Sequence, residues 1–365
     1  MPIELVSRAP LRLLAITMLS VLATACSPGY VLRAAYEQSK ILAARRDIDS
    51  VLSDPTTTPE HKDKLHFVKE ARSYAQTMGL SPGGSFKSYA AVSRDPLAWV
   101  VVASRRDAFS LYTWWFPIVG RVPYKGFFDK EDAESQIKEL ETLGYESSMR
   151  GTEAFSTLGW FDDPVVSTTL KNPPQRIVNT VIHESVHSTV WIPGHVAFNE
   201  SLANFVGAQG SVEFFAAQLG ECRKASTVCD LYEKQLIAVR KESEFQYELA
   251  DLVEVVYADL DTLYKRHDLS SDEKVQQRTQ VFFNATAPFR RAHPTIKILK
   301  EVNNSEIIQL KLYMTKLTLF RELFVRHGGE WRSFIRAIRE IKDKVDADPK
   351  RDPFDVLKEM VGEKR

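Results

Sequence analysis

Apolar positions recur with helical spacing between residues 30 and 80. Ile41, Ile48 and Leu52 belong to this pattern, and Pro55 and Pro59 interrupt it. Proline lacks a backbone N–H and clashes with the preceding turn, so a helix rarely continues through it. The pattern therefore predicts two helices in this part of the chain.

Short aromatic and β-branched segments replace the helical spacing from Ser85 to Phe128, with proline and glycine between them. Segments of this kind are typical of strands, and we expect a small antiparallel sheet. Asp129 is placed to cap a helix that runs to about Leu143, where Gly144 would end it. Residues 154–164 then predict a strand that ends in an acidic turn.

Nearly every segment after Pro174 has helical periodicity. The predicted helices cover residues 175–190, 200–218, 231–266, 271–285, 305–326 and 329–344. The expected fold class is α+β and predominantly α-helical, with the small antiparallel sheet packed on a helical core. We expect one unit over residues 26–365, sheet-rich at about 85–165 and helical at about 175–362.

Composition and charge exclude some classes of partner. The chain has 365 residues, of which 44% are hydrophobic and 26% charged, as is usual for globular proteins. Lys and Arg together number 48, as do Asp and Glu, so the formal net charge is zero. Because no basic excess marks a polyanion-binding surface, we expect no nucleic-acid partner.

The N-terminus resembles an export signal. Arg8 and Arg12 precede an apolar run over residues 13–23, and Ala-Thr-Ala-Cys follows at 23–26. We expect residues 1–25 to form a lipoprotein-type signal peptide and Cys26 to carry lipid; simple secretion or an uncleaved anchor remain alternatives. Ser27 fits the outer-membrane sorting pattern. The expected location is the periplasmic face of the envelope, with contact to the outer membrane through the lipid anchor.

Two further cysteines remain, Cys222 and Cys229. In an oxidising compartment a pair with this spacing could close a small loop. Two buried free thiols are equally compatible with the sequence, because an uninterrupted helix would hold the sulfur atoms too far apart. The spacing does not match a zinc-binding C-x-x-C motif.

His183, Glu184 and His187 form an H-E-x-x-H motif inside a segment with helical periodicity. Residues four apart lie on one face of a helix, so both imidazoles can reach one metal ion. Zinc held by neutral imidazoles lowers the pKa of a bound water to about 7. We therefore expect one Zn²⁺ per chain, with Glu184 as the general base.

Glu200 is the candidate third ligand. Pro193-Gly194 predicts a turn after the motif, and Asn199 is a candidate N-cap of a second helix. This arrangement resembles the thermolysin-like clan of H-E-x-x-H metallopeptidases, which implies Glu200 as the ligand and Asn204 as a residue that orients an imidazole. The clan's usual residue at that position is Asp. His195 is a competing ligand, although the glycine and spacing of the astacin-like pattern are absent.

Several segments together resemble the predicted zinc aminopeptidase family of bacterial lipoproteins. They are Trp115–Gly120, Val122–Phe128, Ser156–Pro164, Ile182–His187 and Phe198–Ser201, with weaker likeness at Asn303-Asn304 and Tyr313. The resemblance covers nearly the whole chain and implies zinc peptidase chemistry more firmly than exopeptidase specificity. Phe155 departs from the family pattern, in which Tyr would be expected.

The resemblance also suggests where a peptide substrate binds. In thermolysin-like enzymes an edge strand pairs with substrate backbone, and Ser156, Thr157, Leu158 and Gly159 are the candidates here; an ordinary core strand is the alternative. Asp162 and Asp163 could bind the free amine of a substrate or could cap the turn before Pro164.

Tyr313 and His327 are candidate donors to the oxyanion of a tetrahedral intermediate, and Tyr313 could equally be a core residue. The G-x-M-E-N sequence of well-known zinc aminopeptidases is absent, which leaves an endopeptidase possible. The leading hypothesis is a zinc metallopeptidase of the envelope. A zinc-bearing lipoprotein that binds peptides or partners without turnover, or a hydrolase of another amide, are the alternatives.

Overall fold

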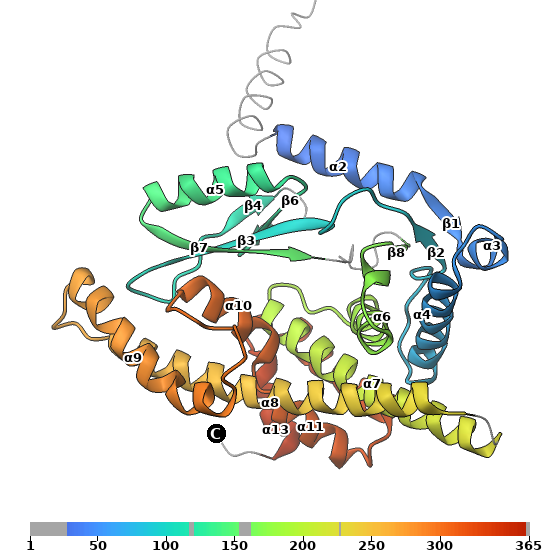
Figure 1. The fold of residues 1–365 in the computed structure, drawn as a ribbon. Helices are drawn as coiled ribbons and strands as arrows, with labels where there is room; N and C mark the ends of the chain where they lie inside the picture. Colours follow the sequence, from blue (N-terminus) through green and yellow to red (C-terminus); the bar gives the residue numbers. More distant parts are fainter. Residues whose placement is uncertain (1–27, 117–119, 153–161, 226–227, 363–365) are drawn as a thin grey trace, which may run out of the picture.

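The computed structural model describes residues 28–116, 120–152, 162–225 and 228–362. Its fold is α+β and mostly helical, as the sequence predicts. The strands lie between two helices, residues 28–43 and 130–142, which are above them in Figure 1, and the larger helical part of the molecule, which is below them. The helices are α2 (Pro28–Ala43), α3 (Ile48–Ser53), α4 (Pro59–Thr77), α5 (Lys130–Thr142), α6 (Pro174–Thr189), α7 (Val196–Lys224), α8 (Asp230–Tyr264), α9 (Ser271–Ala292), α10 (Asn304–Met314), α11 (Leu317–Arg326), α12 (Trp331–Ala347) and α13 (Pro353–Val361).

The main sheet is antiparallel and has the strand order β6-β3-β7. A second sheet has the order β1-β2-β8, in which β1 and β2 are antiparallel and β2 and β8 are parallel. The strands β4 and β5 form a separate antiparallel pair. The strands are β1 (Arg45–Asp47), β2 (Ser88–Ala90), β3 (Ala98–Arg105), β4 (Trp114–Phe116), β5 (Gly120–Val122), β6 (Lys125–Phe127), β7 (Tyr145–Thr152) and β8 (Val165–Val166).

The sheet predicted between Ser85 and Phe128 is confirmed, but its longest pairing uses β7, which the sequence did not predict. β7 has the sequence YESSMRGT, and its polar composition carries little strand signal. Eight residue pairs with β3 hold it in place. Most of the strand predicted over 154–164 lies outside the described residues.

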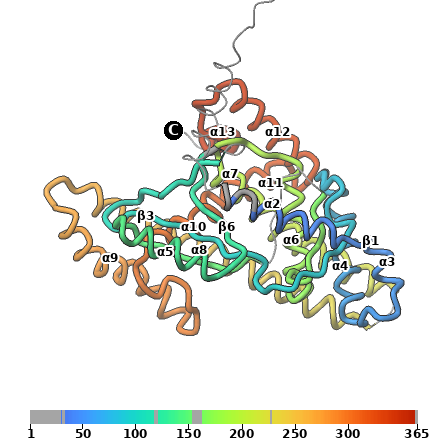
Figure 2. The backbone as a smooth tube through the Cα atoms, turned by 90° about the horizontal axis from the view of Figure 1, so that it is seen from above, coloured from blue at the N-terminus to red at the C-terminus, as the bar shows by residue number. Residues whose placement is uncertain are grey.

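The helical core surrounds α6 and α7. Ile177, Val181 and Ile182 of α6 are fully buried, as are Leu202 and Val206 of α7. The elements α4, α8, α11, α12 and α13 contribute to this apolar cluster, and α12 and α13 lie near one another toward the top of Figure 2. Burial of so many large apolar side chains holds α6 and α7 in a fixed relation. No helix of the described part is both long and apolar enough to cross a membrane.

The helix predicted over 305–326 is two helices, α10 and α11. The backbone N–H of Thr315 donates to Ser201 Oγ at 3.0 Å, and Lys316 has a φ of 55°. A residue in the left-handed region ends a right-handed helix. The contact to α7 therefore replaces the hydrogen bond that would have continued α10.

A buried polar network joins the sheet to three helices. The Glu146 carboxylate of β7 accepts from Arg278 Nη1 and Nη2 of α9 at 2.8 and 2.7 Å, and from the backbone N–H of Asn304 at 2.6 Å. Asn304 Oδ1 accepts from Tyr264 of α8 at 2.8 Å, and Asn304 Nδ2 donates to the carbonyl of Arg105 in β3 at 2.8 Å. Both ends of the bidentate ion pair are buried; the pair fixes α9 against β7, and the Asn304 N–H attaches α10 to the same carboxylate.

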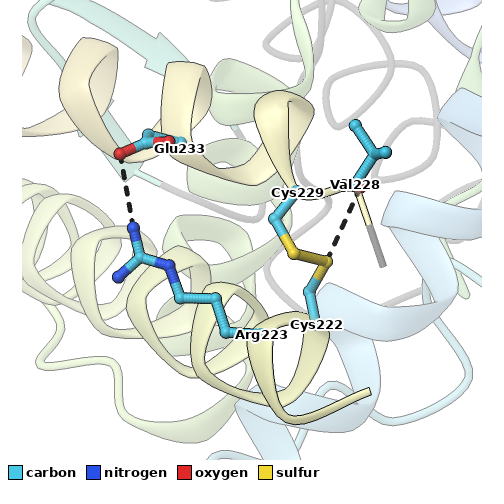
Figure 3. Close-up of a disulfide and its surroundings, with 5 residues drawn as sticks. All are labelled: Cys222, Arg223, Val228, Cys229 and Glu233. Atoms are coloured by element: carbon cyan, nitrogen blue, oxygen red, sulfur yellow. Dashed lines mark hydrogen bonds and ion pairs between the residues drawn. A yellow bond between two sulfur atoms is a disulfide. The ribbon is translucent and has the colours of Figure 1, made fainter. Parts of the chain in front are cut away.

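Cys222 and Cys229 form a disulfide (Figure 3). α7 ends at Lys224 and α8 begins at Asp230, so Cys222 lies in the last turn of α7 and Cys229 directly before α8, with their Cα atoms 5.9 Å apart. Arg223 and Glu233 form an ion pair beside it at 3.3 Å. The disulfide thus closes the α7–α8 connection.

Replacing both cysteines with serine is expected to lower the free energy of unfolding by about 2 to 3 kcal/mol, because a short closed loop restricts the unfolded chain. Urea unfolding of the oxidised protein and of the double variant measures the difference. An equal loss in an Arg223→Gln control with the disulfide intact would contradict this account, because an exposed ion pair contributes at most about 1 kcal/mol.

Candidate metal centre

The H-E-x-x-H segment lies in the second half of α6. This helix begins with Pro174 at its first turn, where the missing N–H costs nothing. Its buried apolar face fixes its rotation, and the residues four apart in the motif then share one side. The His183 and His187 ring centroids are 5.0 Å apart.

Glu200 comes to this pair from α7. One of its carboxylate oxygens, Oε2, lies 3.5 Å from His183 Nε2 and 3.5 Å from His187 Nε2. One ligand atom from each of the three residues lies within 4.8 Å of the others. Ligands placed tetrahedrally at zinc distances of 2.0–2.2 Å would be roughly 3.3 to 3.6 Å apart. The predicted ligands therefore converge with a spacing that fits one zinc ion.

The environment suits a bound cation. Burial alone would raise the pKa of Glu200, but the adjacent imidazoles of His183 and His187 outweigh that effect and hold it well below its ordinary value. Glu200 therefore stays ionised at neutral pH. The His187 side chain is buried, and Nε2 is the nitrogen offered to the metal because it faces Glu200 Oε2 at 3.5 Å.

Gly207 allows α7 to approach α6 behind the metal-binding face. A Cβ at this position would lie 3.2 Å from His183 Cβ and 3.1 Å from Asn179 Oδ1. Both distances are shorter than ordinary van der Waals contact, so a larger residue would push the two helices apart. Glycine here keeps α6 and α7 close together about two turns after Glu200.

His195 does not belong to the cluster of possible metal ligands found in the described part of the chain. It occupies the N-cap position of α7, which begins at Val196. The prediction that Asn199 caps this helix is wrong. Its buried side-chain amide instead accepts from the Ile192 N–H at 3.0 Å and donates to the Ile192 carbonyl at 2.8 Å. These two hydrogen bonds close the turn between α6 and α7 and so determine the position of Glu200 relative to α6.

Glu184 follows His183 directly on α6, is half-buried, and lines a small hollow. Asp163 lines the same hollow from the segment before β8. The remaining lining residues, mostly apolar, are Gln38, Ile41, Phe86, Leu97, Pro164, Val166 and Thr169. Glu184, Asp163 and several apolar side chains therefore line the same hollow.

The two aspartates of the predicted substrate site differ in exposure. Asp163 is buried, its backbone N–H donates to Ser85 Oγ at 3.1 Å, and its carbonyl accepts from the Phe86 N–H at 2.8 Å. Asp162 is exposed, and Arg45 donates to its carbonyl at 3.1 Å. Ser156, Thr157, Leu158 and Gly159, together with Cys26, lie outside the described residues.

Tyr313 lies at the C-terminal end of α10, against the turn of α7 that follows Glu200. Asn204 Nδ2 donates to the Tyr313 carbonyl at 2.8 Å, and Ser201 Oγ donates to the Leu312 carbonyl at 3.2 Å. The sequence predicted that Asn204 orients an imidazole, whereas its side-chain amide donates to a backbone carbonyl of α10. Asn204 thus positions Tyr313 beside the metal ligands. His327 pairs with Ser333 at 2.9 Å, between α11 and α12.

The Tyr313 hydroxyl is held neutral. Burial, and then the negative charge of Glu200, raise its pKa well above the ordinary value, although Arg150 acts in the opposite direction. Arg150 Nη2 donates to the Tyr313 hydroxyl oxygen at 2.9 Å. A tyrosine that remains protonated can serve as a hydrogen-bond donor in the site.

Tyr124 is a candidate site residue that the sequence analysis missed. It lies between β5 and β6, in the segment Val122–Phe128 that carries part of the family resemblance. Burial raises the pKa of its hydroxyl, and the charges of Glu200 and Glu184 raise it further. Its place near two site carboxylates was not predictable from spacing, because the sheet brings it there over a distance of sixty residues or more in sequence.

Comparison with known proteins is consistent with this chemistry. No curated protein and no solved structure gives a significant match to the chain. A family model described as "Putative aminopeptidase" matches residues 29–352, which cover α2 to α12, the hollow beside Glu184 and all three candidate ligands. The match spans far more than half of the sequence, and this chain therefore belongs to that aminopeptidase family.

Proposed function

We propose that this protein is a zinc-dependent aminopeptidase of the cell envelope. The observation that carries the proposal is the convergence of His183, His187 and Glu200 on one point, with Glu184 on the same helix. Membership of the aminopeptidase family supports the reaction class. Three protein ligands leave a coordination position open, as in catalytic rather than structural zinc sites.

Each proposed site residue has a separate role in amide hydrolysis. Zinc held by the three ligands would supply positive charge that polarises the scissile carbonyl and lowers the pKa of water. Glu184 accepts a proton from the attacking water and delivers it to the leaving amine. The protonated hydroxyl of Tyr313 donates a hydrogen bond to the developing oxyanion. Asn204 holds the Tyr313 backbone for this purpose.

Recognition of the substrate amine is assigned to Asp163. Its carboxylate would attract an ammonium group, and it shares the hollow with Glu184 and several apolar residues. An amine that binds Asp163 would then lie beside Glu184, the proposed base. Ser156 to Gly159 are proposed to pair with the substrate backbone.

The proposed location is the periplasmic face of the envelope, with Cys26 lipidated and inserted in the outer membrane. The arginines and apolar run before Cys26 support this proposal. Stable membrane anchoring needs two signals, and a lipidated cysteine with two acyl chains supplies both.

Purified mature protein is expected to contain one zinc per chain and to hydrolyse peptides that have a free N-terminus. Metal analysis and a matched pair of peptides, one free and one N-acetylated, test this together. Cleavage of the free peptide alone supports an aminopeptidase. Equal cleavage of both would identify an endopeptidase, and zinc binding without cleavage of any peptide would leave a binding protein.

A further inference from the structure

The guanidinium of Arg150 is a cation without a carboxylate partner in the described part of the chain. Its described contacts are with Tyr313: Nη2 donates to the hydroxyl oxygen at 2.9 Å, and Cζ lies 5.1 Å from the ring centroid. An exposed arginine is usually mobile, because holding its long side chain costs entropy. Stacking on the ring and donation to its hydroxyl together select one arrangement.

The direction of this hydrogen bond decides where the hydroxyl hydrogen points. Arginine carries donors only, so the Tyr313 oxygen must act as the acceptor. The hydrogen of that hydroxyl is then directed away from Arg150, and no acceptor for it is found among the described residues. α7, which carries Glu200, is bonded to the backbone on either side of Tyr313.

From this geometry we infer that Arg150 is a positioning residue that orients the Tyr313 hydroxyl as a donor toward the reacting carbonyl. The inference rests on the proposed peptidase function and adds a residue that acts through Tyr313 without touching substrate. A donor that is already oriented before the reaction stabilises the transition state without a reorganisation cost.

The elements that carry the pair are joined at a second place. Arg150 is near the end of β7 and Tyr313 near the end of α10. At their other ends, Glu146 of β7 accepts from the backbone N–H of Asn304 in α10 at 2.6 Å, and Asn303 Nδ2 donates to the Ser147 carbonyl at 3.1 Å. These bonds at the start of α10, together with those from Ser201 and Asn204 of α7 to its end, prevent α10 from pivoting on β7. The contact between Arg150 and Tyr313 is therefore a fixed feature of the fold.

The test is a double-mutant cycle on the zinc-loaded protein with Arg150→Met and Tyr313→Phe. Tyr313→Phe is expected to lower kcat about 100-fold, the low end of the effect of losing one oxyanion donor. Arg150→Met is expected to lower kcat about tenfold with KM nearly unchanged. The double variant should be no slower than Tyr313→Phe alone, because Arg150 acts through that hydroxyl. Arg150→Lys, which keeps a donor, should recover part of the rate.

Arg321→Met is the matched control, because Arg321 lies 4.8 Å from the ring centroid of Tyr247, between α11 and α8. It removes an arginine–tyrosine contact outside the proposed site and should leave kcat unchanged. Independent effects of Arg150 and Tyr313 would overturn the inference. A rise in KM confined to peptides with a free C-terminal carboxylate, absent for their amides, would also overturn it and would make Arg150 a carboxylate-binding residue.

A second readout separates this inference from the proposed function. Affinity of the zinc-loaded protein for a phosphinic pseudopeptide, whose tetrahedral oxygens imitate the oxyanion, can be measured by calorimetry without turnover. Arg150→Met and Tyr313→Phe should each weaken binding, and the double variant should be no weaker than Tyr313→Phe. Independent losses of affinity would reject the role of Arg150 even if peptides are cleaved. Absence of peptide cleavage, with the coupled losses preserved, would reject the proposed function alone.

Discussion

Glu184→Gln is expected to lower kcat by about 10² to 10⁴-fold while zinc remains at one atom per chain. Glutamine has nearly the same shape but cannot accept a proton from water at neutral pH. The three proposed metal ligands are other residues, so the metal should stay bound. Steady-state kinetics and metal analysis of the same preparation give both values.

Glu242→Gln is a suitable control for this prediction. Glu242 is an exposed residue of α8 whose carboxylate lies 3.5 Å from Arg176. Its loss should change neither zinc content nor kcat. If Glu184→Gln hydrolysed peptides at the wild-type rate, another group would have to be the base. If it lost zinc, Glu184 would have to be reassigned as a ligand.

Glu146→Gln is expected to lower the free energy of unfolding by about 3 to 5 kcal/mol. The substitution leaves the guanidinium of Arg278 buried without its carboxylate, and it weakens the acceptor of the Asn304 N–H. A buried charge left without a partner costs far more than the pair itself contributes. Urea unfolding followed by circular dichroism measures the change.

Glu134→Gln provides the comparison for an exposed ion pair. Glu134 lies 3.0 Å from Lys130 within α5, and both side chains are about half exposed. Its substitution should cost no more than about 0.5 kcal/mol. Similar losses in the two variants would show that the buried network around Glu146 does not have the assigned importance.

The metal centre was predictable because its ligands follow local rules. The i, i+4 spacing of His183 and His187 fixes their common face, and the Pro193-Gly194 turn brings Glu200 back to it within one helix–turn–helix unit. The error at Asn199 did not affect this result. Its amide closes the turn itself, and the helix begins one turn earlier than a capping Asn199 would require.

The surrounding residues were less predictable because they depend on contacts between distant segments. Tyr124 and Arg150 come from the sheet, and the strand that carries Arg150 has no apolar alternation. The division between α10 and α11 depends on a hydrogen bond from Thr315 to Ser201, more than one hundred residues earlier. The sequence also left open the pairing of Cys222 with Cys229, which requires a break between two helices.

The joined elements β7 and α10 also set a length. Tyr313 lies nine positions after Asn304 in a helix, and Arg150 lies four positions after Glu146 in a strand. At rises of 1.5 and about 3.3 Å per residue, both spans are about 13 Å. The two segments therefore act as spacers of equal length, so the number of residues in each segment matters. Buried side chains such as Ile307 and Ile308 also hold α10 in place, and a single insertion in this helix would turn the tyrosine by about 100° away from the metal ligands.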